Sequence, residues 1–269
     1  MTSSRLWLEQ KGLTAVGGVL LLFLLLPLFS LFATTSFAVF WDSLRHPLLW
    51  PALRLSLTTT VVSLGIVVFL GTPLAWSLTS SRSRAARFLE TLVELPMAIP
   101  PAVVGVALLL TFGKKGLLGT WFGLRGFSLP FSPSAVILAE VFVSAPFFVQ
   151  AAKSAFGRID PQTLIVARSL GAFPMRLFFQ IALPLASPGL LAGATMSWAR
   201  SLGEFGATLM FAGNLEGTTQ TLPLAIYTAL ETDLRAAQTL SLLLVGVAFA
   251  LLLLGRFLLK RTNRTGDRV

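Results

Sequence analysis

The sequence predicts an all-α integral membrane protein with six transmembrane helices and both termini in the cytoplasm. Of its 269 residues, 55% are hydrophobic and 12% are charged, so the charged fraction is about half that of an ordinary soluble domain. Six apolar segments approach the roughly 20 residues that a helix needs to cross the hydrocarbon core. The Lys and Arg residues lie mainly between these segments, and their distribution indicates which side each loop occupies.

The predicted spans follow one another along the chain and cover residues 13–37, 55–78, 92–112, 133–152, 187–211 and 236–259. The uncharged first segment is too long for the apolar region of a typical signal peptide, so we interpret it as a retained span. The sequence therefore divides into an N-terminal span with the first extracytoplasmic loop (residues 1–52), a core of five spans (53–258) and a basic cytoplasmic tail (259–269).

The basic residues are unevenly divided between the two sides. Fourteen lie on the side of the termini: Arg5, Lys11, Arg82, Arg84, Arg87, Lys153, Arg158, Arg168, Arg176, Arg256, Lys260, Arg261, Arg264 and Arg268. Six lie on the other side, namely Arg45, Arg54, Lys114, Lys115, Arg125 and Arg235, and Arg200 falls within the fifth span. Because basic loops stay in the cytoplasm, this bias places the termini there.

Composition also excludes several classes of function. The net charge of +10 reports topology, because its basic residues separate apolar runs and do not form the exposed patch that nucleic-acid binding needs. The chain has no cysteine and a single histidine, His46, so we expect neither a metal centre nor a cofactor bound by this chain. It lacks a nucleotide-binding Gly-x-x-x-x-Gly-Lys-Ser/Thr loop, and we expect no catalytic site of its own.

A cytoplasmic stretch of about thirty residues, 153–184, separates the fourth and fifth spans and is longer than a simple connection between two helices. Its pattern places Ala167, Gly171, Ile181 and Leu183-Pro184 at fixed intervals. Gly171 allows a sharp turn after a short helix, and Pro184 is expected to end one helical piece before the next span. These features predict a compact cytoplasmic projection.

This spacing resembles the loop of type I ABC importer permeases, which reads Glu-Ala-Ala, three residues, Gly, nine residues, Ile, one residue and Leu-Pro. Ile165 and Val166 stand where that family has Glu and Ala, so an acidic group is missing. An amphipathic surface helix with a glycine cap is the simpler alternative. The resemblance implies that the projection couples the spans to an ATPase through Ala167, Arg168, Gly171, Ala172, Ile181, Leu183 and Pro184.

The same resemblance implies the partners and location of the protein. It implies a bacterial or archaeal inner-membrane homodimer of type I permease fold, with a cytoplasmic ABC ATPase dimer that binds ATP and Mg²⁺ and an extracytoplasmic oxyanion-binding protein. The segment around the fifth span is similar to that of molybdate permeases, which implies molybdate or tungstate as substrate. A sulfate or thiosulfate permease is the alternative, and a secondary transporter is a further one.

Six residues are candidates for the translocation pathway or its gate: Pro100, Pro101, Arg200, Glu204, Thr208 and Asn214. Pro100-Pro101 interrupts the third span and suits a gate, although a plain proline kink is equally compatible with the sequence. Arg200 and Glu204 are four residues apart, so they are expected to pair on one helix face. Whether this pair attracts an anion or only holds the bundle together stays open.

Overall fold

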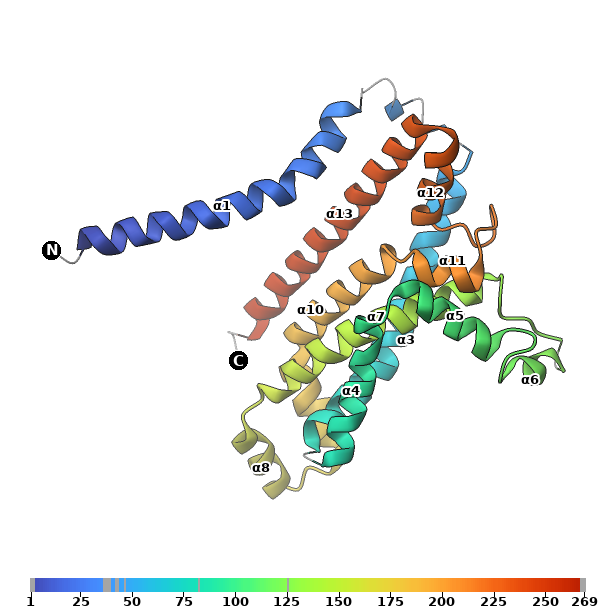
Figure 1. The fold of residues 1–269 in the computed structure, drawn as a ribbon. Coiled ribbons are helices and arrows are strands. Elements are labelled where there is room, and N and C mark those ends of the chain that lie inside the picture. Colours follow the sequence, from blue (N-terminus) through green and yellow to red (C-terminus); the bar gives the residue numbers. More distant parts are fainter. Residues whose placement is uncertain are drawn as a thin grey trace.

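The computed structural model describes residues 3–35, 40–41, 44–45, 47–81, 83–124 and 126–266, with side chains described from residue 14 to residue 261. His46, Arg82, Arg125 and Arg268 lie outside the described residues. Helices, turns and loops make up the described ranges, and these ranges contain no strand (Figure 1). Four of the predicted spans are single helices: α1 (Ser3–Thr34), α3 (Leu49–Ser80), α7 (Pro133–Gly157) and α13 (Leu234–Gly266).

The third span is broken, as the sequence predicted. It consists of α4 (Arg84–Ala98) and α5 (Pro101–Phe112), which are bent by 114° relative to each other. Pro100 and Pro101 lack backbone N–H groups, and each disfavours the helical conformation of the residue before it. Ile99 and Pro100 accordingly both have ψ of 134°. With this bent pair counted as one span, the described residues contain six candidate membrane spans.

The fifth span differs from the prediction of one helix over residues 187–211. The spanning helical run is Pro174–Leu202, made of α9 (Pro174–Leu177), the π-helix η1 (Phe178–Ala182) and α10 (Leu183–Leu202). Residues 203–205 then break the helix, and α11 (Gly206–Ala212) begins a new direction. The predicted boundary was wrong because Gly203 ends α10, and the apolar residues that follow belong to a separate helix, α11.

Pro184 also acts differently from the prediction that it ends a helical piece. It lies in the first turn of α10, inside the continuous helical run. The π-helix immediately before it has wider hydrogen-bond spacing, which accommodates the missing N–H group of a proline inside a helix. The projection before this span is consequently shorter than residues 153–184, because α7 extends to Gly157 and the next helical run already begins at Pro174.

Helix α7 forms the centre of the bundle. One apolar cluster joins α7 to α3 and α10 and includes Phe148 and Phe156 of α7. A second cluster joins α7 to α5 and α11 around Phe211. A third lies at the other end of the molecule, where the start of α3 packs against α12 (Leu222–Thr232) and α13. Helix α1 stands apart from this bundle in Figure 1, and no residue of its apolar window is buried.

Candidate functional site

The projection between α7 and α10 is built around α8 (Pro161–Ser169). Asp160 caps this helix, since its carboxylate accepts a hydrogen bond of 2.9 Å from the backbone N–H of Gln162, and Pro161 occupies the first helical position. Only three residues separate the end of α7 from the start of α8, and Arg158 and Ile159 donate backbone hydrogen bonds to the last turn of α7. The helix is therefore attached to α7 through a short, ordered turn.

Gly171 ends the projection in a left-handed turn. Its φ is +85°, and its N–H donates to the carbonyl of Arg168, while the N–H of Ala172 donates to the carbonyl of Ala167, both at 3.0 Å. This pair of bonds is the Schellman arrangement, which requires a residue that tolerates positive φ. The predicted turn at Gly171 is confirmed, and Ala167 is the buried residue of α8.

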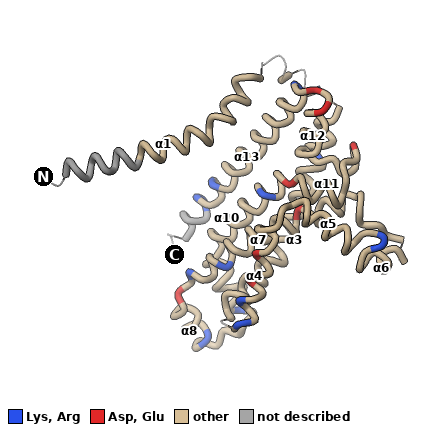
Figure 2. The backbone as a smooth tube through the Cα atoms, viewed as in Figure 1, with Lys and Arg blue, Asp and Glu red and all other residues tan. Residues whose placement is uncertain are grey.

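Part of the exposed surface of the projection is apolar. Large hydrophobic side chains that extend away from the bundle include Ile165, Val166, Leu170, Phe173 and Met175. Ile165 stands at the acidic position of the resembling loop and Val166 at the alanine after it, and both are more than half exposed. Exposed apolar residues clustered on a compact projection indicate a surface that docks another protein. Lys and Arg positions gather at this end of the molecule in Figure 2, around α8, the lower end of α4 and the end of α13.

Aromatic side chains hold the base of the projection. The rings of Trp76 (α3) and Phe156 (α7) have centroids 5.3 Å apart, and Phe178 of η1 lies 5.8 Å from Trp76 and 6.2 Å from Phe156. These three residues come from the helices that enter and leave the projection and from α3. A displacement of α8 therefore acts on a packed junction of three spanning segments and not on a loose loop.

The two helix breaks lie against each other. A β-carbon placed on Gly105 of α5 would be 2.7 Å from the carbonyl oxygen of Ala207 and 2.6 Å from Cβ of Met210. On Gly206 of α11, a β-carbon would be 3.1 Å from Cβ of Pro101. The small residues thus allow the short helices after each break to touch closely within one chain. Gly206 therefore packs against α5 of the same chain.

Arg200 and Glu204 form the predicted ion pair, with 2.8 Å between Nη2 of Arg200 and Oε2 of Glu204. Glu204 lies beyond the end of α10, however, so the pair crosses the break and does not share one helix face. The other carboxylate oxygen of Glu204 accepts a hydrogen bond of 2.8 Å from the N–H of Ala207 at the start of α11. Glu204 is buried, whereas the Arg200 side chain is 28% exposed. Because one oxygen of the carboxylate pairs with Arg200 and the other bonds to Ala207, this group joins α10 to α11.

The remaining pathway candidates lie on or after α11. Thr208 is fully buried, and within the described residues its hydroxyl has no hydrogen-bond partner. Asn214 follows the end of α11, where its amide donates to the hydroxyl of Thr228 at 2.9 Å. Pro101, Arg200 and Glu204 thus gather at one end of α11, and Asn214 belongs to a separate polar cluster at its other end.

Several long-range polar contacts were not predicted from the sequence. Glu140 of α7 is buried and accepts hydrogen bonds from Thr59 at 2.8 Å and Ser63 at 2.7 Å, both on α3. Lys153 forms an ion pair with Glu90, and Gln150 donates to Glu94, so both contacts join α7 to α4. Their only signal in the sequence is the position of charged residues within or beside apolar segments.

Comparison with known proteins identifies membrane transport permeases that resemble this chain. The family model described as "binding-protein-dependent transport system inner membrane component" matches residues 67–264. The molybdenum transport system permease protein ModB of Mycobacterium tuberculosis is 43% identical over 243 residues, which cover 90% of this chain and 91% of that protein. ModB of Escherichia coli is 35% identical over 207 residues, covering 76% and 89%. A probable transport system permease protein NifC of Clostridium pasteurianum is 38% identical over 203 residues, covering 75% and 71%.

Solved structures show the same fold at lower identity. A chain of a bacterial ABC transporter that imports alginate superposes with a TM-score of 0.76 at 18% identity, covering 96% of both chains. A chain of the inward-facing MetNI methionine ABC transporter superposes with a TM-score of 0.66 at 21% identity, covering 84% of this chain and 99% of that one. The matched residues, the relatives and the six candidate spans agree: this multi-pass membrane protein belongs to the family of binding-protein-dependent transport system inner membrane components.

Proposed function

We propose that this chain is the permease subunit of an ABC importer that moves molybdate into the cytoplasm. The observation that carries this proposal is the likeness, over nearly the full length, to permeases named for molybdenum transport. In neutral water molybdenum is available as the tetrahedral oxyanion molybdate, so a system for taking up the element transports this anion. Tungstate has the same charge and shape and is expected to use the same path.

The geometry supports a coupled mechanism in which a partner ATPase acts on the permease through α8. Its exposed apolar residues dock a cytoplasmic ABC ATPase, which binds ATP and Mg²⁺, and the permease itself holds neither. Closure of the ATPase displaces α8, and the aromatic junction of Trp76, Phe156 and Phe178 transmits the displacement to α3, α7 and α10. The two broken spans then reorient around the contact between α5 and α11.

The distribution of charge supports the orientation and the remaining partners. The end of the molecule that carries α8 is rich in Lys and Arg, and we place it in the cytoplasm together with both termini (Figure 2). The opposite end, with α6 (Gly119–Gly123) and α12, receives an extracytoplasmic oxyanion-binding protein. A second copy of this chain completes the pathway and covers the apolar faces of α4 and α5 that are exposed here. The complex resides in the cell membrane of a bacterium or archaeon.

Uptake into proteoliposomes tests the proposal. The chain is reconstituted with its ATPase and binding protein, and the uptake of labelled molybdate is followed with tungstate or sulfate as competitor. We expect ATP-dependent uptake that tungstate blocks and sulfate does not. Omission of the binding protein, and replacement of ATP by a non-hydrolysable analogue, serve as controls. Uptake that sulfate blocks would assign the chain to sulfate or thiosulfate instead, and uptake without ATP would indicate a secondary transporter.

A further inference from the structure

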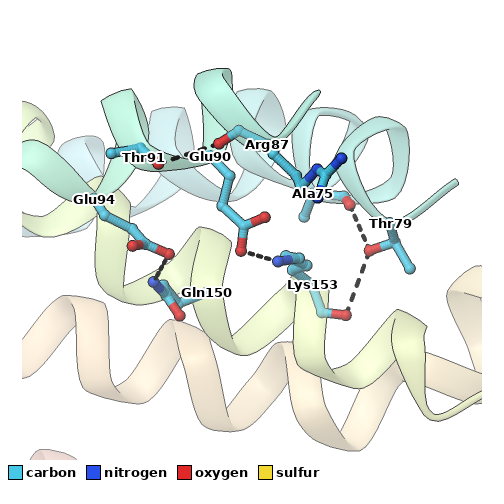
Figure 3. Close-up of polar contacts among 8 residues, drawn as sticks. All are labelled: Ala75, Thr79, Arg87, Glu90, Thr91, Glu94, Gln150 and Lys153. Atoms are coloured by element: carbon cyan, nitrogen blue, oxygen red, sulfur yellow. Dashed lines mark hydrogen bonds and ion pairs between the residues drawn. The ribbon is translucent and has the colours of Figure 1, made fainter. Parts of the chain in front are cut away.

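Two polar contacts join α4 to α7 in the half of the bundle nearest α8 (Figure 3). Nζ of Lys153 pairs with a carboxylate oxygen of Glu90, and the amide of Gln150 donates to a carboxylate oxygen of Glu94. Glu90 and Glu94 are one turn apart on α4, and Gln150 and Lys153 are nearly one turn apart on α7. The four side chains therefore form two successive cross-links between the helices, which we call the α4–α7 latch.

Helix α4 has little else that fixes its position within the chain. Ala86 is its only buried residue, and Val93 is partly buried against the cluster around Phe148. Its larger apolar side chains are exposed here: Phe88, Leu89, Leu92, Leu95 and Met97. The side chains of Lys153 and Glu90 are 32% and 30% exposed, so they pair in a partly dehydrated environment where an ion pair is stronger than in water. The latch thus sets the register of α4 on α7.

The latch is also directly connected to the projection. Lys153 lies four residues before the end of α7, and its carbonyl oxygen accepts a hydrogen bond of 3.4 Å from Thr79 of α3. From Gly157 the chain enters α8 through three residues that are held by backbone hydrogen bonds and by the Asp160 cap. No flexible linker separates Lys153 from α8, so a displacement of α8 reaches Lys153 with little loss.

The other side of the latch leads to the broken third span. Helix α4 continues through Ile99 and Pro100 into α5, whose Pro101 and Gly105 contact α11. A movement of α4 therefore changes the angle at the break and the contact between the two short helices. Among the described residues of α4 and α7, the latch is therefore the polar connection that links the projection to this break.

We propose that the α4–α7 latch makes α4 move with α7 as one body, so that displacement of α8 reaches the broken third span. This inference rests on the proposed function, since it assumes an ATPase that moves α8. Glu90 and Lys153 are positioning residues in this mechanism, because they contact neither nucleotide nor the transported anion. The latch stays closed throughout the transport cycle, and the break at Ile99–Pro100 changes angle.

Charge reversal with rescue tests the latch. The complex with ATPase and binding protein is reconstituted with Glu90→Lys, with Lys153→Glu or with both, and the anion taken up per ATP hydrolysed is measured. Each single reversal is expected to lower this ratio about tenfold, within the usual range of coupling free energies, while ATP hydrolysis continues. The double reversal is expected to restore the ratio. Arg84→Glu, at the exposed start of α4, is the matched control that leaves it unchanged.

The ratio distinguishes coupling from a purely structural role. Loss of folded protein would lower uptake and ATP hydrolysis in parallel and leave their ratio constant. An unchanged ratio in both single variants, whether or not the total activity falls, would overturn the proposal. The wild-type complex is assayed with molybdate and sulfate in parallel, and the variants are compared using the anion that it transports. The wild-type result therefore reports on the proposed function, and the variants report on the latch.

Cross-linking tests whether the two helices stay together. The chain contains no cysteine, so Glu90→Cys combined with Lys153→Cys introduces a unique pair of thiols. Without a linker this double variant is expected to show the lowered ratio of uptake to ATP hydrolysis. Joining the thiols with a flexible bifunctional methanethiosulfonate should restore it, because the helices need not separate. If the linked protein hydrolyses ATP but transports no anion, α4 and α7 move apart during the cycle and the proposal fails.

Discussion

Gly206 of α11 lies directly against Pro101 of α5, so close that a β-carbon on Gly206 would be 3.1 Å from Cβ of Pro101. This contact brings together two helix breaks that are about a hundred residues apart in the sequence. Proline creates the first break by removing backbone donors, and glycine allows the second short helix to approach it. The site proposed for reorientation during transport is therefore built from backbone geometry as much as from polar side chains.

Substitution in this contact should destabilise the protein. Gly105→Ala places a methyl group 2.7 Å from the carbonyl oxygen of Ala207, and this backbone atom cannot move aside as a flexible side chain can. We expect the free energy of unfolding to fall by about 2 kcal/mol, as for other overpacked core positions. Thermal melting of the purified protein in detergent measures the effect. Gly65→Ala is the matched control, because nothing lies within 4 Å of the added methyl group. Equal melting temperatures for the two variants would contradict this packing.

The turn at Gly171 should be required for coupling. Gly171→Val places a β-branched residue at a φ of +85°, which costs about 1–3 kcal/mol locally and distorts the end of α8. We expect normal membrane insertion with severely reduced uptake per ATP hydrolysed. Gly217→Val imposes similar strain at a φ of +71° in the turn before α12, away from the projection. An equal effect of both variants on the ratio would contradict a specific role for α8.

Proline at position 171 should have a stronger effect than valine. A proline cannot adopt positive φ, and it removes the N–H group that donates to the carbonyl of Arg168. Gly171→Pro is therefore expected to abolish ATP-dependent uptake while the spans remain inserted, as judged by membrane fractionation and protease protection. Normal ATP-dependent uptake by a correctly inserted Gly171→Pro protein would show that this turn has no part in coupling.

The pair of Arg200 and Glu204 should act as a fixed connection between α10 and α11. Arg200→Met leaves the buried carboxylate of Glu204 with the N–H of Ala207 as its remaining partner. We expect a loss of about 2 kcal/mol in unfolding free energy, less than for a fully buried pair because Arg200 is partly exposed. Combining it with Glu204→Gln should restore both stability and uptake, because glutamine still accepts the hydrogen bond from Ala207. If the double variant regains its stability but has a higher KM for molybdate than the wild-type protein, Arg200 instead contacts the anion.

Glu140 should stabilise the packing of α3 on α7 through its two hydroxyl partners. Glu140→Ala leaves the hydroxyls of Thr59 and Ser63 without this partner and opens a cavity. We therefore expect the free energy of unfolding to fall by about 3 kcal/mol. Glu140→Gln retains an acceptor and a donor and should cost less than about 1 kcal/mol. Melting temperatures of both variants, compared with Glu216→Ala at an exposed position, measure the difference. A Glu140→Gln protein as unstable as Glu140→Ala would show that the negative charge itself is required.

The sequence predicted those parts of the site that depend on nearby residues. The Pro100-Pro101 break needs only two adjacent prolines, and the turn after α8 needs only a glycine that accepts positive φ. The ion pair of Arg200 and Glu204 was also predicted from spacing, although Glu204 lies in the helix break after α10. That break was missed because apolar residues resume at Phe205 and continue to Ala212, and nothing local marks the bond of Glu204 to the start of α11.

By itself the sequence determined the helical class, the approximate spans and the places where the backbone must bend, because length, hydropathy, proline and glycine act locally. Only the tertiary structure decided which polar side chains from distant parts of the chain meet. Glu140 and Thr59 are 81 residues apart in the chain, and Lys153 and Glu90 are 63 apart. Such contacts depend on which helices pack together and in what register. A polar group in an apolar environment must be paired, and the packing determines which partners lie within reach.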